Sequence, residues 1–370
     1  MRRAYILFAA AASALSCCAM SSSEAISRLL NSRAAGSPKA FAEAAEFVAK
    51  DAAAGHPLQQ FVIAVVADDP ALPESIRPSR EVRERYLAAS RGRIRALAEG
   101  KGNALAWYLL SIERNDLRML KRAVDGGNPQ ALNAWGTLTL TKALSGPVTE
   151  GEDLDRVVER SFLCFKRAAE QKDANGFYNL GMCYFNGYGC REDKDKAFDC
   201  FRTAADSGHP EAINNIGGLY RDGEVVERDP VIATKWFAKS ASLGNAYGQL
   251  NYALALQRGE GTAQDPERAA ALLCEAAGKG LPEAMNAYAM CLYAGTGVKK
   301  DERTAVTWYR RAAKEGFAPA MENLATCYDL GSGGLEKSAE ESTVWKVRAR
   351  AARGDRNAMA WLSQNGYGLR

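Results

Sequence analysis

The side chains that most often carry catalysis are sparse in this chain. Among 370 residues there are two histidines, His56 and His209, and both stand in a Gly-His-Pro tripeptide. That shared context indicates turn residues rather than a paired acid and base. The sequence contains no Gly-x-Ser-x-Gly, His-Glu-x-x-His or Ser-x-x-Lys, the spacings typical of serine hydrolases, zinc proteases and β-lactamases. We therefore predict no catalytic residue, no metal site and no cofactor.

Two further spacings could suggest ligand chemistry. Gly187 and Gly189 form a Gly-x-Gly pair that resembles a phosphate loop, and Asp193 could ligate a cation. Both features recur at a fixed interval, which is typical of helix-ending glycines and helix-capping aspartates rather than of a single site. The glycine recurs at Gly187, Gly223, Gly259, Gly295 and Gly331, and the aspartate at Asp193, Asp229, Asp265 and Asp301.

The interval of 36 residues predicts a tandem array of helical hairpins. The first helix of a copy opens at a Gly-x-Pro-x-Ala junction such as 208–212, where proline suits the first turn, and ends at the recurrent glycine. The second helix opens at the aspartate and carries an apolar stripe such as Ala197, Phe201 and Ala205. The predicted fold class is all-α, an α/α superhelical solenoid of antiparallel helix pairs.

The repeat unit as a whole carries a family resemblance. Its pattern Ala-x-x-x-Leu-Gly-x-x-Tyr, Gly-x-Gly, Asp-x-x-x-Ala and a closing Ala-Ala resembles the Sel-1-like repeat family, relatives of the tetratricopeptide repeats. We divide the chain into a signal peptide (1–19), a linker or short first helix (20–36), degenerate helical repeats (37–172), five Sel-1-like repeats of about 36 residues (173–354) and a C-terminal capping helix (355–370).

An asparagine recurs one residue before the Leu-Gly position of the first helix in four of five copies. The resemblance to tetratricopeptide arrays implies that this part of the helix faces a concave groove, where an amide offers a donor and an acceptor to an extended peptide. The alternative is that these amides bond to neighbouring helices and hold the repeats together, and both can be true. The predicted partner-binding residues are Asn179, Asn215, Asn251, Asn323, Tyr178, Asn214, Asn286, Arg221, Arg258, Tyr247 and Tyr293.

The partner that this pattern favours is a protein or peptide. Lys and Arg total 48 against 44 Asp and Glu, a net charge of +4 that is too even for a nucleic-acid-binding face. The sequence does not indicate the oligomeric state.

The N-terminal residues predict export. Arg2 and Arg3 precede an apolar segment over 5–15 that is too short to span a bilayer, as in a bacterial signal peptide. Small residues follow this segment at 16–19. They fit signal-peptidase cleavage after Ala19, and they also fit lipoprotein processing at Cys17 or Cys18. The sequence does not decide between the two. The predicted location is the periplasm or cell envelope, with secretion as a further outcome, and membrane contact only through a lipid anchor.

Seven cysteines follow the predicted signal. Cys164 and Cys200 share a slot that holds tryptophan in other copies, which indicates buried packing. Equivalent positions in stacked repeats lie about 10 Å apart, too far for a disulfide. A Cys164–Cys183 or Cys183–Cys200 bridge stays open, and we favour mostly reduced thiols, at least one of them free because seven is odd.

Two other functions remain as alternatives. Some exported cysteine-rich relatives have been credited with β-lactam binding or hydrolysis, which would make the chain an envelope hydrolase; a nitrocefin assay tests this. A peptidoglycan or glycan module would instead use Trp107, Trp135 and Trp361. Binding to cell-wall sacculi would separate that module from a protein-binding scaffold.

Overall fold

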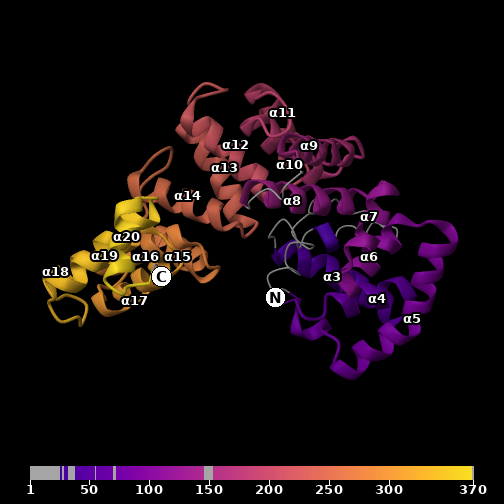
Figure 1. Cartoon of the computed structure of the whole chain (residues 1–370), viewed down its shortest axis with the longest axis horizontal. Helices are drawn as coiled ribbons and strands as arrows, with labels where there is room; N and C mark the ends of the chain where they lie inside the picture. Colours follow the sequence, from indigo (N-terminus) through magenta and orange to yellow (C-terminus); the bar gives the residue numbers. More distant parts are fainter. Residues whose placement is uncertain are drawn as a thin grey trace. The chain divides into compact units, whose positions relative to one another are not determined.

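A computed structural model describes residues 26, 29–31, 38–54, 56–69, 72–145 and 153–368 of the chain. All regular structure in these ranges is helical (Figure 1). The chain divides into two compact units, Met1–Arg228 and Asp229–Arg370, each treated by itself below as unit 1 and unit 2. The all-α solenoid of antiparallel helix pairs predicted from the 36-residue interval is confirmed.

The helices follow one another with short connections. Unit 1 contains α3 (Pro38–Ala53), α4 (Pro57–Val65), η1 (Glu74–Ile76), α5 (Arg80–Lys101), α6 (Ala104–Arg114), α7 (Leu117–Asp125), α8 (Pro129–Ser145), α9 (Leu154–Glu170), α10 (Ala174–Asn186), α11 (Lys194–Asp206) and α12 (Pro210–Asp222). Unit 2 contains α13 (Pro230–Ser242), α14 (Ala246–Arg258), α15 (Pro266–Gly278), α16 (Pro282–Ala294), α17 (Glu302–Lys314), α18 (Ala318–Leu330), α19 (Ala339–Ala352) and α20 (Arg356–Gln364).

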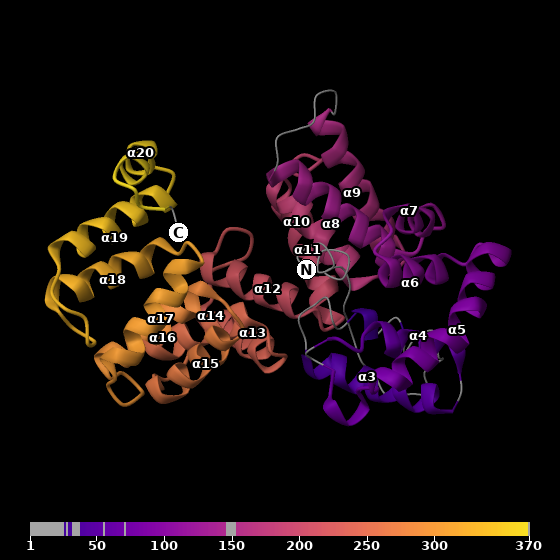
Figure 2. The ribbon, with the colours of Figure 1, turned by 60° about the horizontal axis from the view of Figure 1, so that its bottom comes forward.

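Helix pairs pack side by side in each unit. In unit 1, α10 packs against α9 and α11, and in unit 2, α16 packs against α15 and α17 (Figures 1 and 2). The even-numbered helices α10 to α18 are the first helices of the repeats and are called A helices here. The odd-numbered helices α11 to α19 are called B helices, and the same assignment extends back to the pair α8 and α9.

The ends of the repeat helices confirm the sequence prediction. Gly187 takes the left-handed conformation at the C-cap of α10, with φ of 70°. The Asp193 side chain accepts the Lys196 backbone N–H at the start of α11. The other copies repeat these caps at Gly223, Gly259, Gly295, Gly331, Asp229, Asp265 and Asp301.

The second glycine of the Gly-x-Gly pair has a packing role. At Gly261, φ is +68° and a Cβ would lie 2.0 Å from the Pro230 carbonyl oxygen. The turn after an A helix therefore packs directly against the backbone of the preceding B helix. This contact leaves no room for a side chain at Gly261.

The core of each pair combines small and aromatic side chains. Ala197, Phe201 and Ala205 are buried on α11, and a Cβ on Gly181 of α10 would lie 2.7 Å from the Phe201 ring. Close approach of two helices at a small residue leaves room for one aromatic ring. The same stripe is buried in unit 2 at Ala305, Tyr309 and Ala313.

The two ends of the array depart from the regular pair. Near the N-terminus, the Asn103 side chain caps α6 by accepting the Ala106 N–H, but α5 is a 22-residue helix unlike those of the repeats. At the C-terminus, α20 buries Leu362 and stacks Trp361 on Tyr367, as a capping helix would. Within the described ranges, no helix combines the length and the hydropathy needed to cross a membrane.

Candidate partner-binding face

The recurrent asparagines make a repeated contact between A helices. Asn179 of α10 donates through Nδ2 to Oδ1 of Asn133 on α8, at 3.2 Å. In unit 2, Asn323 of α18 makes the equivalent bond to Asn286 on α16, at 2.8 Å. Each bond reaches back to the preceding A helix, so at these two positions an asparagine does link neighbouring repeats.

The same amides keep hydrogen-bonding capacity for a partner. Asn179 and Asn323 are half-buried, and the side-chain carbonyl of each has no hydrogen-bond donor within the described part of the chain. An amide with a second N–H and an open carbonyl can still pair with a peptide group. Asn215 makes only a weak contact, from Nδ2 to the Met182 sulfur at 3.7 Å. The structural interpretation is therefore confirmed at Asn179 and Asn323, and the binding interpretation stays a prediction.

Helical register places three of the predicted residues on one side of α14. Tyr247, Asn251 and Arg258 are separated by four and seven residues, which brings side chains onto a common helix face. Tyr247 is 50% exposed and Asn251 is half-buried. Arg258 is exposed and lies 3.8 Å from the Glu260 carboxylate, a loose pair at a helix end.

Two apolar residues that the sequence analysis did not single out extend this face. Met290 follows Asn286 by four residues on α16 and is 52% exposed, and Leu330 follows Asn323 by seven on α18 and is 63% exposed. Exposed large side chains at the asparagine register would have been a usable signal, but exposure cannot be read from the sequence. The helix-A strip of unit 2 is defined here as Tyr247, Asn251, Arg258, Met290, Tyr293, Asn323 and Leu330.

The remaining predicted residues have mixed environments. Asn286 is buried, and its Oδ1 is the acceptor for Asn323. Tyr293 is half-buried and its hydroxyl donates to Ser332 Oγ at 3.1 Å. Arg221 pairs with the adjacent Asp222 at 2.7 Å. Tyr178 and Asn214 are half-buried, and Cys17 and Cys18 lie outside the described residues.

A buried polar cluster underlies the first asparagine contact in unit 1. The Asp173 side chain caps α10 by accepting the Gly176 N–H, and it also accepts Asn133 Nδ2 at 2.7 Å. Asn31, from the N-terminal segment, contacts Asp173 at 3.5 Å and accepts Gln130 Nε2 at 3.2 Å. Burial raises the pKa of the Asp173 carboxyl, and the hydrogen bonds from Gly176 and Asn133 partly offset that rise.

His209 is the second buried titratable group of this cluster. Its Nε2 lies 3.0 Å from Asn175 Oδ1, its Nδ1 accepts the Ala212 N–H, and its ring stacks on Tyr178 at 4.5 Å. Burial lowers the pKa of His209 to about 3. The imidazole is therefore neutral at physiological pH and acts as a helix cap, consistent with its prediction as a turn residue.

The thiols meet the prediction of buried packing only in part, because Cys164 and Cys200, whose slot predicts burial, are half-buried. Cys183, Cys291 and Cys327 are buried, and Cys164, Cys190 and Cys200 are half-buried, whereas Cys274 is exposed. Burial, with the nearby Cys190 and Cys200, raises the pKa of Cys183 to about 12. Across the described ranges, His, Cys, Asp and Glu side chains do not gather in threes as a metal site would require.

Two of the three tryptophans named for a glycan module have covered ring faces. Trp107 is 8% exposed and lies under the Arg122 guanidinium, 4.6 Å from the ring centroid. Trp361 is stacked on Tyr367 at 5.9 Å. Only Trp135 keeps a ring face without such a partner in the described chain.

Comparison with known proteins agrees with this architecture. A Sel1 repeat family model matches 146–173, 178–209, 210–245, 246–281, 282–317 and 318–345, together more than half of the chain. The structure is similar to a Sel1 repeat protein from Oxalobacter formigenes, with 25% identity and a TM-score of 0.57, over 68% of this chain and 100% of that one.

A second similar structure is c5321, a protective antigen of uropathogenic Escherichia coli strains with an SLR fold. It is 25% identical with a TM-score of 0.53, over 86% of this chain and 66% of that one. No curated protein matches the sequence significantly.

The fold defines a helical-repeat solenoid of the scaffold class. Such solenoids generally mediate protein interactions rather than catalysis. The chain belongs to the Sel1 repeat family.

Proposed function

We propose that this protein is an exported, non-enzymatic scaffold that binds a segment of a partner protein along the helix-A strip of unit 2. The observation that carries the proposal is the coincidence of two registers. Asparagines recur on successive A helices, and Tyr247, Met290 and Leu330 are exposed at positions four or seven residues from them. Exposed apolar side chains among polar groups are typical of interaction surfaces.

Each part of the strip has its own task in binding. The Asn323 amide is fixed by its bond to Asn286 and retains an open carbonyl for a backbone N–H of the partner. Met290 is flexible and polarizable and adapts to differently shaped side chains. Arg258, held only at 3.8 Å from Glu260, is available for a partner carboxylate.

A photo-cross-linking experiment tests the site. The photo-reactive residue benzoylphenylalanine replaces Met290 in the full chain, which is expressed in the organism that naturally makes the protein. A matched chain carries it at Val231, which is 48% exposed in unit 2 but lies on a B helix. We expect one discrete cross-linked protein from the Met290 position, reduced by Asn323→Ala, and none from Val231. Equal products from both positions, or products unchanged by Asn323→Ala, would place the binding surface elsewhere.

Export is the second part of the proposal and rests on Arg2, Arg3 and the apolar segment 5–15. Lipidation at Cys18 is proposed because Leu15 and Ser16 fit a lipobox. Cell fractionation of the parent chain and of the Cys17→Ser/Cys18→Ser variant tests both points. Recovery of the parent in the membrane fraction and of the variant in the soluble envelope fraction is expected. Cytoplasmic recovery of both would contradict export.

A further inference from the structure

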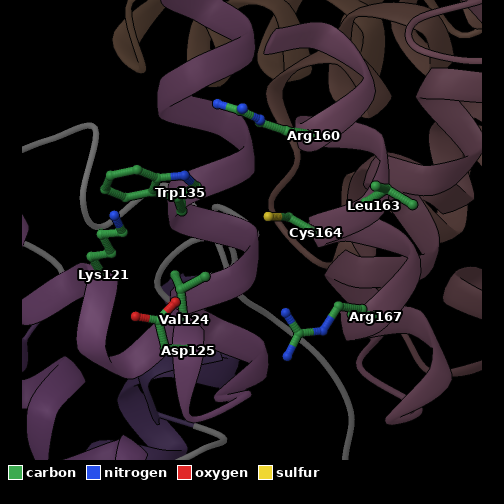
Figure 3. Close-up of a pocket in the computed structure, with 8 residues that line it drawn as sticks. All are labelled: Lys121, Val124, Asp125, Trp135, Arg160, Leu163, Cys164 and Arg167. Carbon is green, nitrogen blue, oxygen red and sulfur yellow. The ribbon is translucent and has the colours of Figure 1, made fainter. Parts of the chain in front are cut away.

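Helices α7, α8 and α9 of unit 1 line a cleft that shares no residue with the helix-A strip. Its volume is about 460 Å³, within the usual range for binding pockets. Figure 3 shows the Cys164 sulfur directed toward the side of Trp135, and the Arg167 guanidinium directed toward Asp125. The lining consists of Lys121, Val124, Asp125, Trp135, Arg160, Leu163, Cys164 and Arg167.

The cleft arises because one repeat has a small side chain where another has a large one. In the α16–α17 pair, Tyr288 meets Trp308 edge to face, with ring centroids 5.8 Å apart. Trp135 precedes Gly136 as Tyr288 precedes Ala289, and Cys164 precedes Phe165 as Trp308 precedes Tyr309. A thiol thus stands where another repeat places an indole. The smaller side chain leaves space beside Trp135, which is half-buried and lines the cleft.

Trp135 differs in this respect from the other five tryptophans. Every other indole has a cation or a ring over it: Arg122 on Trp107, Lys239 on Trp236, Arg311 on Trp308, Arg348 on Trp345 and Tyr367 on Trp361. In the described chain, Trp135 has neither. An uncovered indole in a cleft can take an apolar or aromatic group from a ligand.

The charges around the indole are unbalanced. Lys121, Arg160 and Arg167 are exposed and make no ion pair within the described ranges. Asp125 is the one carboxylate in the lining, so the cleft carries an excess of two positive charges. Elsewhere in unit 1 many basic side chains are paired, as Arg91 is with Glu113.

We propose that this cleft binds an acidic segment of a partner protein, with an apolar side chain against Trp135 and carboxylates on Arg160, Arg167 and Lys121. The mixed lining favours a polypeptide over a nucleic acid, because Val124 and Leu163 offer apolar contact to a side chain, whereas nucleic-acid binding rests on the neutralisation of many phosphates. The proposal does not depend on the helix-A strip, which belongs to other helices.

Cys164 supplies a local reporter for the test. It is half-buried in the cleft, whereas Cys274 is exposed on α15 and serves as an internal control. Burial raises the pKa of the Cys164 thiol, so alkylation by iodoacetamide is run at about pH 8.5 and followed by peptide mass spectrometry. The probes are the peptides Glu-Asp-Phe-Asp-Glu and Lys-Lys-Phe-Lys-Lys and a thymidine decanucleotide.

The expected result is selective protection of Cys164 in the full chain. We expect the acidic peptide at millimolar concentration to slow Cys164 alkylation about threefold or more, while Cys274 alkylation is unchanged. The protection should weaken in about 0.5 M salt. It should disappear in Arg160→Gln/Arg167→Gln and persist in Arg93→Gln/Arg202→Gln, which removes the same charge from exposed sites elsewhere.

Three results would overturn the proposal. They are equal protection by the basic peptide or the oligonucleotide, protection that persists in Arg160→Gln/Arg167→Gln, and alkylation of Cys164 that no probe slows. Circular dichroism of both double variants confirms that a lost effect is not a lost fold.

Discussion

Asn323 donates an amide hydrogen to the side-chain carbonyl of Asn286 across 2.8 Å, and the same backward bond joins Asn179 to Asn133 at 3.2 Å. The second residue of each pair lies deeper than the first. The buried amide thereby orients an amide that is still partly open to solvent. If the proposed function holds, one side chain links the repeats and also presents a binding group.

The buried member of such a pair should matter more for stability than the half-buried one. Asn133 is fully buried and donates to Asp173 Oδ1 at 2.7 Å, so Asn133→Ala leaves a buried carboxyl group without that donor. We expect Asn133→Ala to lower the free energy of unfolding by about 2 kcal/mol and Asn179→Ala by about 0.5 kcal/mol. Urea denaturation measures both, and a larger loss for Asn179→Ala would contradict this ranking.

Two glycines with positive φ separate backbone strain from steric overlap. A Cβ at Gly280, where φ is +94°, meets nothing within 4 Å, whereas at Gly261 it meets the Pro230 carbonyl at 2.0 Å. We expect Gly280→Ala to cost about 1 kcal/mol and Gly261→Ala about 3 kcal/mol or more, because the loop must also move. Thermal unfolding of the two variants tests the difference, and equal melting temperatures would show that the turn is not held against α13.

Acid should destabilise the protein through His209. Its pKa is lowered to about 3 in the folded chain, against 6.5 ordinarily, so between these values the unfolded state binds the extra proton. The free energy of unfolding should therefore fall as the pH falls, by up to about 2 kcal/mol between pH 6.5 and 5. Glu211, 3.3 Å from Nδ1, favours the protonated ring and makes this an upper bound.

The control for this pH effect is His209→Asn, which reproduces the Asn245 cap at the equivalent position of unit 2. The variant should lose the part of the pH dependence of the free energy of unfolding that we assign to the imidazole. Asp173 acts in the opposite sense, since its raised pKa makes stability fall as the pH rises above its ordinary value, and it remains in both chains. Identical pH profiles for parent and variant would exclude His209 as the cause.

Thiol reactivity should follow burial. Cys183 is 1% exposed and its pKa is raised to about 12, so it should resist alkylation in the folded chain, whereas exposed Cys274 should react readily. Mass spectrometry after a timed reaction with iodoacetamide measures both sites. Comparable rates would show that the helix pair α10–α11 is not packed as described. A Cys183 that resists even in denaturant without reductant would indicate one of the disulfides left open by the sequence.

The periodic features were predictable from sequence because each has a local cause. Gly187 and Asp193 mark helix ends through backbone conformation and capping, which depend on neighbours a few residues away. Met290 and Leu330 could not be singled out, because their exposure depends on which sides of α16 and α18 the adjacent helices cover. The Trp135 cleft depends on a different helix, α9, which has the small Cys164 where α17 has Trp308. The bond from Asn31 to Asp173 joins residues 142 apart, and no repeat pattern signals it.

The buried N-terminal segment has a consequence for diffusion. Ile26 is fully buried in the core of unit 1, and it lies only eight positions after Cys18 in the sequence. An extended chain of that length reaches at most about 27 Å. With a lipid on Cys18, as proposed, Ile26 would stay within about that distance of the bilayer, and unit 1 would be tethered through it. The search for a partner anchored in the same membrane would then be two-dimensional, at a local concentration far above that of free protein.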